Sequence, residues 1–453
     1  MANTIKKEKT AEEQLSKALI PKEEQPYNIP DNWVWTNLGS TIELISGRDI
    51  STRLCNDAGI GIPYILGASN IENGVFTVER WIDNPEVISN EGDILLSVKG
   101  TIGKIYLQKE KEINISRQIM ALRSLGMIDK FYLKYYLEHI SEMLKESGNG
   151  LIPGITRSFI IKYILPLPPH PEQHRIIVSI ERMFEQLDRA KELVQTAIDN
   201  FETRKSAILH KAFTGELTAK WRKENNTNMG SWCDKNLQSI CLTKITDGTH
   251  QTPIYCDKDC GLPFISSKDI KLGKINWQNI KYIPQNLHDV LYKRIAPQRD
   301  DILLAKNGTT GVAAIVDTDI EFDIYVTLAV LRPNLNEIIP FYLLMVINSP
   351  ICKTQFDENL TGIGVPNLHL RDIKEVTIPV PPISEQQEIV RILDDILKKE
   401  QNTNEFYSVI DKIDLMKKAI LAKAYRGDLG TNDPSEESAI TQLKESFESG
   451  NEI

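Results

Sequence analysis

The chain lacks long apolar segments. Hydrophobic residue types make up 41% of its 453 residues, but they are spread out, and no run reaches the roughly 18 consecutive apolar residues that a bilayer-spanning helix needs. The charged start Met1–Lys9 leads into no apolar stretch of the kind that a secretory signal contains. We therefore expect a cytoplasmic protein without a membrane segment.

Cysteine is scarce, with 6 residues in the whole chain. In a long chain without a secretory signal, such cysteines are expected to be free thiols rather than a disulfide framework. Four of them fall between Cys233 and Cys260, where a structural zinc site is the alternative interpretation. However, Cys256 and Cys260 form the one close pair, and no second pair follows at zinc-ligand spacing. We therefore expect plain thiols and no metal ligands.

Sequence motifs of catalysis are also missing. The chain contains no Gly-x-Gly-x-x-Gly after a strand-like run, no Walker A segment, no His-Glu-x-x-His and no Gly-x-Ser-x-Gly. It also lacks the Asn/Asp-Pro-Pro-Tyr/Phe segment of amino-methyltransferases. Glu172 and Glu385 stand at matching helix starts, where first-turn acids complement the helix dipole, and we do not expect them to be paired catalytic acids. Catalysis by this chain alone is not expected.

The formal net charge of −9 gives no sign of a nucleic-acid partner. Much of the excess of acid over base lies after Gly427, where the chain has seven Asp and Glu residues and Lys444 as the one basic residue. Ser, Asn and Gly are also frequent there, so residues 431–453 are predicted to be a disordered acidic tail. Without this tail the chain is only mildly acidic, and a local basic face would suffice for binding nucleic acid.

The sequence contains a long internal repeat. Several segments recur in the same order with a slowly drifting offset, which indicates a tandem duplication of domain-sized units. The recurring pairs are Gly92–Gly103 with Asp300–Gly311, Pro166–Gln173 with Pro379–Gln386, and Lys205–Leu217 with Lys417–Leu429. The shared segments are interpreted as a common framework, and the divergent ones as places where the copies do different work.

Each copy has a globular part and a helical part. The globular parts mix short strand-like runs with Gly, Asn and Pro turns, which predicts α+β domains. Pro168-Pro169 then breaks the chain, and apolar residues follow at alternating steps of four and three, which is a coiled-coil pattern. The second copy repeats this pattern around a polar middle at Glu400–Glu405. The expected seam residues are Ile176, Ile180, Leu187, Val194, Phe201, Ile389, Leu393, Ile396 and Ile410.

The simplest architecture pairs the two helices as an antiparallel coiled coil that separates two globular domains. The alternative is that both helices are core helices of one large domain. Their length and the Pro-Pro punctuation favour the separating coiled coil.

Over nearly the whole chain, the sequence resembles the specificity subunit of Type I restriction–modification systems. The motifs that carry the resemblance are the two Pro-x-Pro-Pro-x-x-Glu-Gln segments at 166–173 and 379–386, the helix ends at 207–217 and 419–429, and the segments Ile29–Trp35 and Thr246–His250. Each motif alone is weak, but the ordered and duplicated set is specific.

The resemblance implies that each globular part is a target recognition domain reading one half of a split, asymmetric DNA sequence. It implies two long helices that set the spacing and dock two methyltransferase subunits, with restriction–translocase subunits joining them. S-adenosylmethionine, ATP and Mg²⁺ are then expected on those partners. The expected parts are an N-terminal arm (1–29), recognition domain 1 (30–168), a central helix (169–222), recognition domain 2 (223–380), a C-terminal helix (381–430) and the acidic tail (431–453).

Candidate DNA contacts are proposed in both copies. Two Gly-Thr loops follow strand-like runs, and they can either hold a phosphate or be tight turns that need glycine. Arg117, Gln118 and Arg48 suit guanine or adenine edges, but they can equally be solvated side chains. The full set is Arg48, Lys99, Gly100, Thr101, Arg117, Gln118, Asp247, Gly248, Thr249, His250, Lys306, Asn307, Gly308 and Thr309.

The two copies differ at one candidate. The first has no Asp-Gly-Thr-His segment like the one at 247–250, and its nearest match is Ser46–Asp49. His250 is interpreted either as a DNA contact or as an ordinary surface residue. Trp33 and Trp35 are expected to be core anchors rather than base-stacking platforms.

Overall fold

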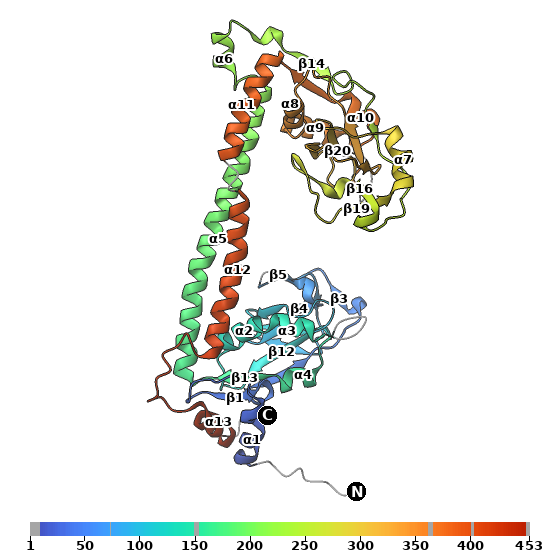
Figure 1. Cartoon of the computed structure of the whole chain (residues 1–453). Helices are drawn as coiled ribbons and strands as arrows, with labels where there is room; N and C mark the ends of the chain where they lie inside the picture. The colour runs from blue at the N-terminus through green and yellow to red at the C-terminus, as the bar shows by residue number, and fades with distance from the viewer. Residues whose placement is uncertain (1–9, 73, 149–153, 361–365, 400–402, 450–453) are drawn as a thin grey trace. The chain divides into compact units, whose positions relative to one another are not determined.

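The computed structural model describes residues 10–72, 74–148, 154–360, 366–399 and 403–449. It divides into two compact units (Figure 1). Unit 1 comprises residues 1–193 and 408–453, and unit 2 comprises residues 194–407. In the described part of the chain, no helix is long and apolar enough to cross a membrane.

The globular part of unit 1, here called domain 1, is built on an antiparallel four-stranded sheet with the order β10-β9-β12-β2. A second sheet has the order β3-β7-β4-β11-β8, with its strands interspersed along the sequence with those of the first, and β1 pairs with β13. The strands of the first sheet are β2 (Ile42–Ser46), β9 (Ile94–Ser97), β10 (Ile105–Leu107) and β12 (Ile119–Ser124). The strands of the second sheet and of the β1–β13 pair are β1 (Val34–Asn37), β3 (Cys55–Asn56), β4 (Ile62–Ile65), β7 (Trp81–Ile82), β8 (Ile88–Asn90), β11 (Glu112–Ile115) and β13 (Ile164–Leu167).

Alternation along β9 directs its side chains into two different cores of domain 1. Ile94 and Leu96 of β9 enter the larger core, whereas Leu95 enters a smaller one on the opposite face. The larger core also receives the helices α2 (Lys130–His139), α3 (Ser141–Glu146) and α4 (Arg157–Lys162). Trp33 and Trp35 are each only 3% exposed, which confirms them as core residues.

The globular part of unit 2, domain 2, repeats this plan. Its four-stranded sheet has the order β15-β23-β20-β21, a three-stranded sheet has the order β19-β16-β22, and β14 pairs with β24. The strands are β14 (Cys233–Asn236), β15 (Thr246–Asp247), β16 (Gly261–Ile265), β19 (Lys281–Pro284), β20 (Ile302–Ala305), β21 (Ala313–Ile315), β22 (Asp323–Ile324), β23 (Leu328–Leu331) and β24 (Thr377–Val380). The helices are α7 (Gln285–Arg294), α8 (Pro340–Ile347), α9 (Pro350–Glu358) and α10 (Leu370–Glu375).

The structure confirms the two long helical regions that the sequence predicts. α5 (His170–Phe213) has 44 residues, which corresponds to about 66 Å at 1.5 Å per residue. In unit 1 it pairs with α12 (Thr403–Arg426), and ion pairs join Asp188 to Lys417 and Lys191 to Asp414, which makes the pair antiparallel (Figure 1). In unit 2 the end of α5 shares a core with α11 (Ile383–Lys399). The polar middle predicted at 400–405 begins outside the described residues.

The predicted seam is buried at its two ends and half-buried between them. Ile176 and Ile180 are fully buried in the core of domain 1, and Ile389 and Leu393 are buried in the core of domain 2. Phe201 is also buried. Leu187, Val194, Ile396 and Ile410 are half-buried. Two paired helices cannot enclose their seam as a globular core does, so the middle residues keep contact with solvent.

The predicted disorder of the acidic tail is wrong for residues 439–448. Residues 439–448 form helix α13 (Ala439–Glu448), which contacts α1 (Ala11–Ala18) of the N-terminal arm. Ala439, Leu443 and Phe447 are buried in the core of domain 1. These three residues recur every four positions, so the segment is an amphipathic helix with acidic residues on its outer face. The acidic composition concealed this spacing.

Candidate DNA interface

Each domain carries a tight turn at the end of an edge strand, here called turn 1 (Ser46–Asp49) and turn 2 (Asp247–His250). The backbone N–H of Arg48 donates to the Ile115 carbonyl at 3.0 Å, and that of Thr249 donates to the Ile324 carbonyl at 3.2 Å. Ile115 and Ile324 hold the same place, since each pairs in parallel with the corresponding strand of its own domain. Turn 1 is therefore the counterpart of turn 2 in backbone position, and it is the segment identified from the sequence as the nearest match to residues 247–250.

Glycine is required in both turns because another backbone passes close by. A Cβ on Gly47 would lie 2.1 Å from the Ser116 carbonyl oxygen, and one on Gly248 would lie 2.0 Å from the Ile324 carbonyl oxygen. Real Cβ atoms do not approach backbone so closely. The shared glycine thus fixes the turn against the neighbouring strand and leaves the flanking side chains free to differ.

Turn 2 is held by a buried ion pair. The Lys306 ammonium lies 2.5 Å from the Asp247 carboxylate, and both side chains are only 8% exposed. The other carboxylate oxygen of Asp247 lies 3.3 Å from the His250 ring, which is 70% exposed. Lys306 and Asp247 therefore bind each other inside the domain, whereas Thr249 and His250 stand at the surface.

The corresponding positions of domain 1 carry no charge. The backbone N–H of Val98 donates to the Gln118 carbonyl as that of Lys306 does to the Thr327 carbonyl, so Val98 occupies the place of Lys306. Ser46 occupies the place of Asp247. The apolar Val98 in the aligned copy was the signal that Lys306 would be buried.

Turn 1 is flanked by exposed guanidinium groups instead. Arg117 pairs with Asp49 at 2.6 Å, and its side chain is 67% exposed. Arg48 pairs with Glu86 at 3.6 Å, and its side chain is 75% exposed. Surface pairs of this kind are weak, so both guanidinium groups can exchange their partners for another acceptor.

The Gly-Thr loops are turns that require glycine. Gly100 and Gly308 have φ of +72° and +76°, and Gly103 and Gly311 have φ of +85° and +83°. These values favour glycine over every other residue. The side chains at the tips of these loops still face outward, since Lys99, Thr101 and Thr309 are exposed, Asn307 is partly so, and Gln118 reaches the same edge beside Gly100.

The two buried glutamates of the helix starts hold their own units together. Glu385 accepts hydrogen bonds from Thr218 at 2.6 Å and from Trp232 at 2.9 Å, and it pairs with Arg222 at 2.5 Å. Glu172 binds Arg175 and accepts hydrogen bonds from the Thr431 hydroxyl and the Asn432 backbone. Each glutamate is fully buried, with relative exposure of 0%. These contacts give the two glutamates a structural role within their own units.

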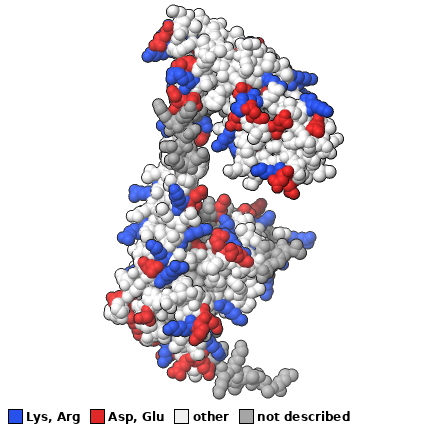
Figure 2. All heavy atoms as spheres, viewed as in Figure 1, with Lys and Arg blue, Asp and Glu red and all other residues white. Residues whose placement is uncertain are grey.

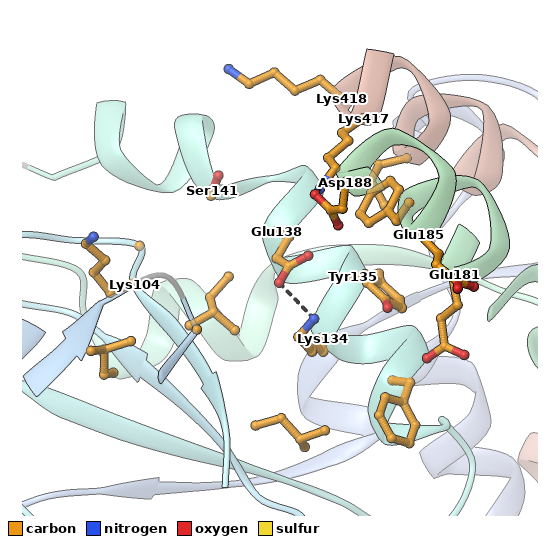
Figure 3. A pocket seen from close by; sticks show the side chains of 18 of the residues that line it. Lys104, Lys134, Tyr135, Glu138, Ser141, Glu181, Glu185, Asp188, Lys417 and Lys418 are labelled. Atoms are coloured by element: carbon orange, nitrogen blue, oxygen red, sulfur yellow. Dashed lines mark hydrogen bonds and ion pairs between the residues drawn. The ribbon is translucent and has the colours of Figure 1, made fainter. Parts of the chain in front are cut away.

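In the described part of the chain, neither the charge distribution nor the groove of unit 1 described below offers a simple anion site. On the face of each unit seen in Figure 2, basic and acidic side chains are interspersed. A groove of about 800 Å³ in unit 1 contains several lysines, but Lys417 pairs with Asp188 and Lys134 pairs with Glu138 (Figure 3). The groove is therefore largely self-neutralised, and the two turns remain the better candidates.

The described residues bring together no group of three His, Cys, Asp or Glu side chains that could hold a metal ion. All six cysteines are free thiols. Burial raises the pKa of the Cys241 and Cys352 thiols to about 12.

Comparison with known proteins identifies relatives along most of the chain. The model of the family described as Type I restriction modification DNA specificity domain matches residues 30–200 and 256–411. The chain is 24% identical over 433 residues to the Type I restriction enzyme EcoBI specificity subunit of Escherichia coli, covering 89% of this chain and 87% of that one. It is also 24% identical over 396 residues to the MjaVIII specificity subunit of Methanocaldococcus jannaschii, covering 83% and 88%.

A solved structure has the same fold. It comes from work on complex assembly and conformational transition of the type I R-M system, and it matches with a TM-score of 0.65 at 20% identity. The match covers 89% of this chain and 100% of that one.

Proposed function

Because the chain belongs to the family of Type I restriction modification DNA specificity domains, we propose that it is the DNA sequence-specificity subunit of a Type I restriction–modification complex. Each domain binds one half of a bipartite target. The observation that carries this proposal is the pair of turns: their backbones correspond, but their exposed side chains do not. Two such turns suit two different half-sites, so the target is asymmetric.

The helical pair supports a second part of the proposal, which is docking of two methyltransferase subunits. The seam is only half-buried in its middle, and apolar side chains point to solvent on both helices of unit 1. Leu193 is 69% exposed on α5, and Leu415 and Met416 are 64% and 53% exposed on α12. Exposed apolar patches on a helical pair are typical of partner-binding surfaces. We propose that methyltransferase helices cover this surface and that restriction–translocase subunits join the assembly.

Catalysis then belongs to the partners. The chain lacks the motifs that bind S-adenosylmethionine or ATP, and its buried glutamates are committed to structural contacts. We propose that S-adenosylmethionine, ATP and Mg²⁺ are held by the methyltransferase and restriction–translocase subunits.

The test is co-expression of the chain with the methyltransferase encoded beside it, followed by sequencing of host DNA for methylated adenine. The expected result is a new motif of two unlike halves, which disappears when the chain is omitted. The alternative function is a two-domain scaffold without a DNA role. In that case no new motif would appear, and the purified chain would show no salt-dependent binding to DNA.

Insertions into the helical pair test the spacing role. One heptad added after Ala190 of α5, matched by one after Asp414 of α12, lengthens the pair by about 10 Å, or about three base pairs of DNA. Three heptads lengthen it by about 31 Å, close to one turn of the duplex. We expect the gap between the half-sites to widen accordingly, with the three-heptad variant more active because both halves again face the same side. An unchanged gap would refute the spacing role.

A further inference from the structure

The arginine side chains near turn 1 and turn 2 come from different structural elements. In domain 1, Arg48 lies on turn 1 and Arg117 flanks it. The corresponding positions of domain 2 are Thr249 and Val326, because Arg117 and Val326 directly precede the residues that accept from Val98 and Lys306. The Arg117 N–H donates to the Asp49 carboxylate of turn 1, and the Val326 N–H donates to the Thr249 carbonyl of turn 2. Domain 2 therefore lacks arginine at both places where domain 1 has it.

A different element supplies the missing group. Arg294, in the last turn of α7, donates from Nη2 to the carbonyl oxygens of Asp247 at 2.6 Å and Gly248 at 2.7 Å. The residue is exposed, and in the described part of the chain its Nε and Nη1 atoms have no partner. One guanidinium nitrogen thus fixes the group on turn 2, and the remaining N–H groups are available to another acceptor.

Helix α7 is itself firmly placed. His288 is buried, and its Nδ1 lies 2.7 Å from the Asp323 carboxylate of β22. The next residue of β22, Ile324, accepts the hydrogen bond from turn 2. In domain 1 the position of Asp323 is taken by Asn114, whose side-chain oxygen accepts from the backbone N–H groups of Glu86 and Val87 at 2.8 and 3.1 Å and so fixes an extended segment there. The helix that carries Arg294 is thus an addition of domain 2, anchored to the same strand that positions its turn.

We propose that Arg294 is a specificity-determining DNA contact of domain 2, replacing the function of Arg48 and Arg117 in domain 1. The inference rests on the proposed DNA-binding function of the two turns. The group fits acceptors on a base edge, and guanine offers two of them, O6 and N7, in the major groove. Its attachment to two carbonyl oxygens orients the guanidinium before DNA arrives, which lowers the entropic cost of the contact.

The experiment uses the full chain in complex with the methyltransferase. Arg294→Ala, Arg294→Lys and Arg117→Ala are compared with Lys293→Ala, which removes a neighbouring exposed charge of α7. Methylation is measured for every single-base variant of both half-sites, together with the salt dependence of binding. We expect Arg294→Ala to reduce the base preference at one position of one half-site by about 10-fold to 100-fold. Arg117→Ala should affect the other half-site.

The matched variants separate a base contact from a phosphate contact. Lysine carries the charge without the planar fork, so Arg294→Lys should not restore the base preference, and Lys293→Ala should leave it unchanged. Equal weakening for all sequences, restored by Arg294→Lys, would mean a phosphate contact and overturn the proposal. So would an unchanged preference in Arg294→Ala, or the same half-site affected by Arg294→Ala and Arg117→Ala.

Two controls keep the result interpretable. Amide exchange of β15 and β23 shows whether domain 2 of the Arg294→Ala variant is intact; if it is not, Arg294→Gln, which retains a donor for the turn, takes its place and must show the same loss of preference. Failure of the proposed function is distinguishable, because then the unmodified chain directs no methylation to a bipartite motif.

Discussion

Domain 1 and domain 2 hold corresponding turns with different chemistry. Turn 1 relies on backbone contacts with uncharged Ser46 and Val98 behind it, whereas turn 2 has the buried Asp247–Lys306 pair at those positions. A close backbone approach at glycine is common to both. The two turns therefore keep the same backbone position although the residues behind them are uncharged in domain 1 and charged in domain 2.

The largest expected effect comes from breaking the buried pair of domain 2. Lys306→Ala leaves the Asp247 carboxylate buried without its cation, which should destabilise domain 2 by about 3–5 kcal/mol. Replacing both residues by their domain 1 counterparts, Lys306→Val with Asp247→Ser, should restore most of this loss because no charge stays buried. Hydrogen exchange of β20 and β23 amides measures both. A double variant as unstable as Lys306→Ala would show that the two turns are not interchangeable.

The next effect concerns the extra helix of unit 1. Phe447→Ala removes a buried ring from the contact of α13 with domain 1 and should cost about 3 kcal/mol. Exposed Ile440, on the same helix, is the matched control, and Ile440→Ala should change stability by less than about 0.5 kcal/mol. Urea unfolding monitored separately in the two units tests this. A loss shared equally by unit 2 would contradict the assignment of α13 to domain 1.

A smaller effect distinguishes Asp323 from Asn114. Burial raises the pKa of Asp323 above its ordinary 3.8, although His288 acts in the opposite direction. A raised pKa means that the folded state binds this proton more tightly, so its contribution to stability is complete below 3.8 and is lost as pH rises through the raised value. Asp323→Asn should remove this dependence from domain 2. The free energy of unfolding of domain 2 is measured from pH 3 to 7 in the variant and in the unmodified chain. The same pH dependence in both would contradict the prediction.

The smallest effect is chemical and leaves stability untouched. With pKa values of about 12, the Cys241 and Cys352 thiols of unit 2 are almost entirely protonated at pH 8. They should react with iodoacetamide far more slowly than exposed Cys233 and Cys260. Mass spectrometry after brief labelling compares the four sites in one sample. Equal labelling of Cys352 and Cys233 would show that the core of domain 2 opens readily.

Much of the architecture could be predicted from the sequence, because repetition and periodicity are visible in it. The duplicated order, the long helices and the ends of their seam followed directly from repeated Pro-Pro breaks and heptad spacing. Arg294 could not be found in this way. It lies on a helix without a counterpart in the other copy, and its relation to turn 2 depends on a fold that brings residues 247 and 294 together.

Two other predictions were wrong although the sequence contained a pattern that contradicted them. Lys306 was expected to contact DNA because a lysine side chain can donate to a phosphate. However, the aligned residue in the other copy of the repeat is the apolar Val98. Residues 431–453 were expected to be disordered because they are acidic, although Ala439, Leu443 and Phe447 recur at helical spacing. In both cases a position-specific pattern predicted burial better than the average chemistry of the segment.

The hydrogen bonds from Thr431 and Asn432 to Glu172 affect the order in which the two domains can fold during translation. Unit 2 is one continuous stretch, 194–407, whereas unit 1 needs both ends of the chain. During vectorial synthesis, residues 30–168 of domain 1 are made before unit 2 but must wait for residues 408–449 before their final contacts can form. Domain 2 can therefore complete its folding earlier, although it is made later, and a truncated product would carry a finished second domain beside an unfinished first one.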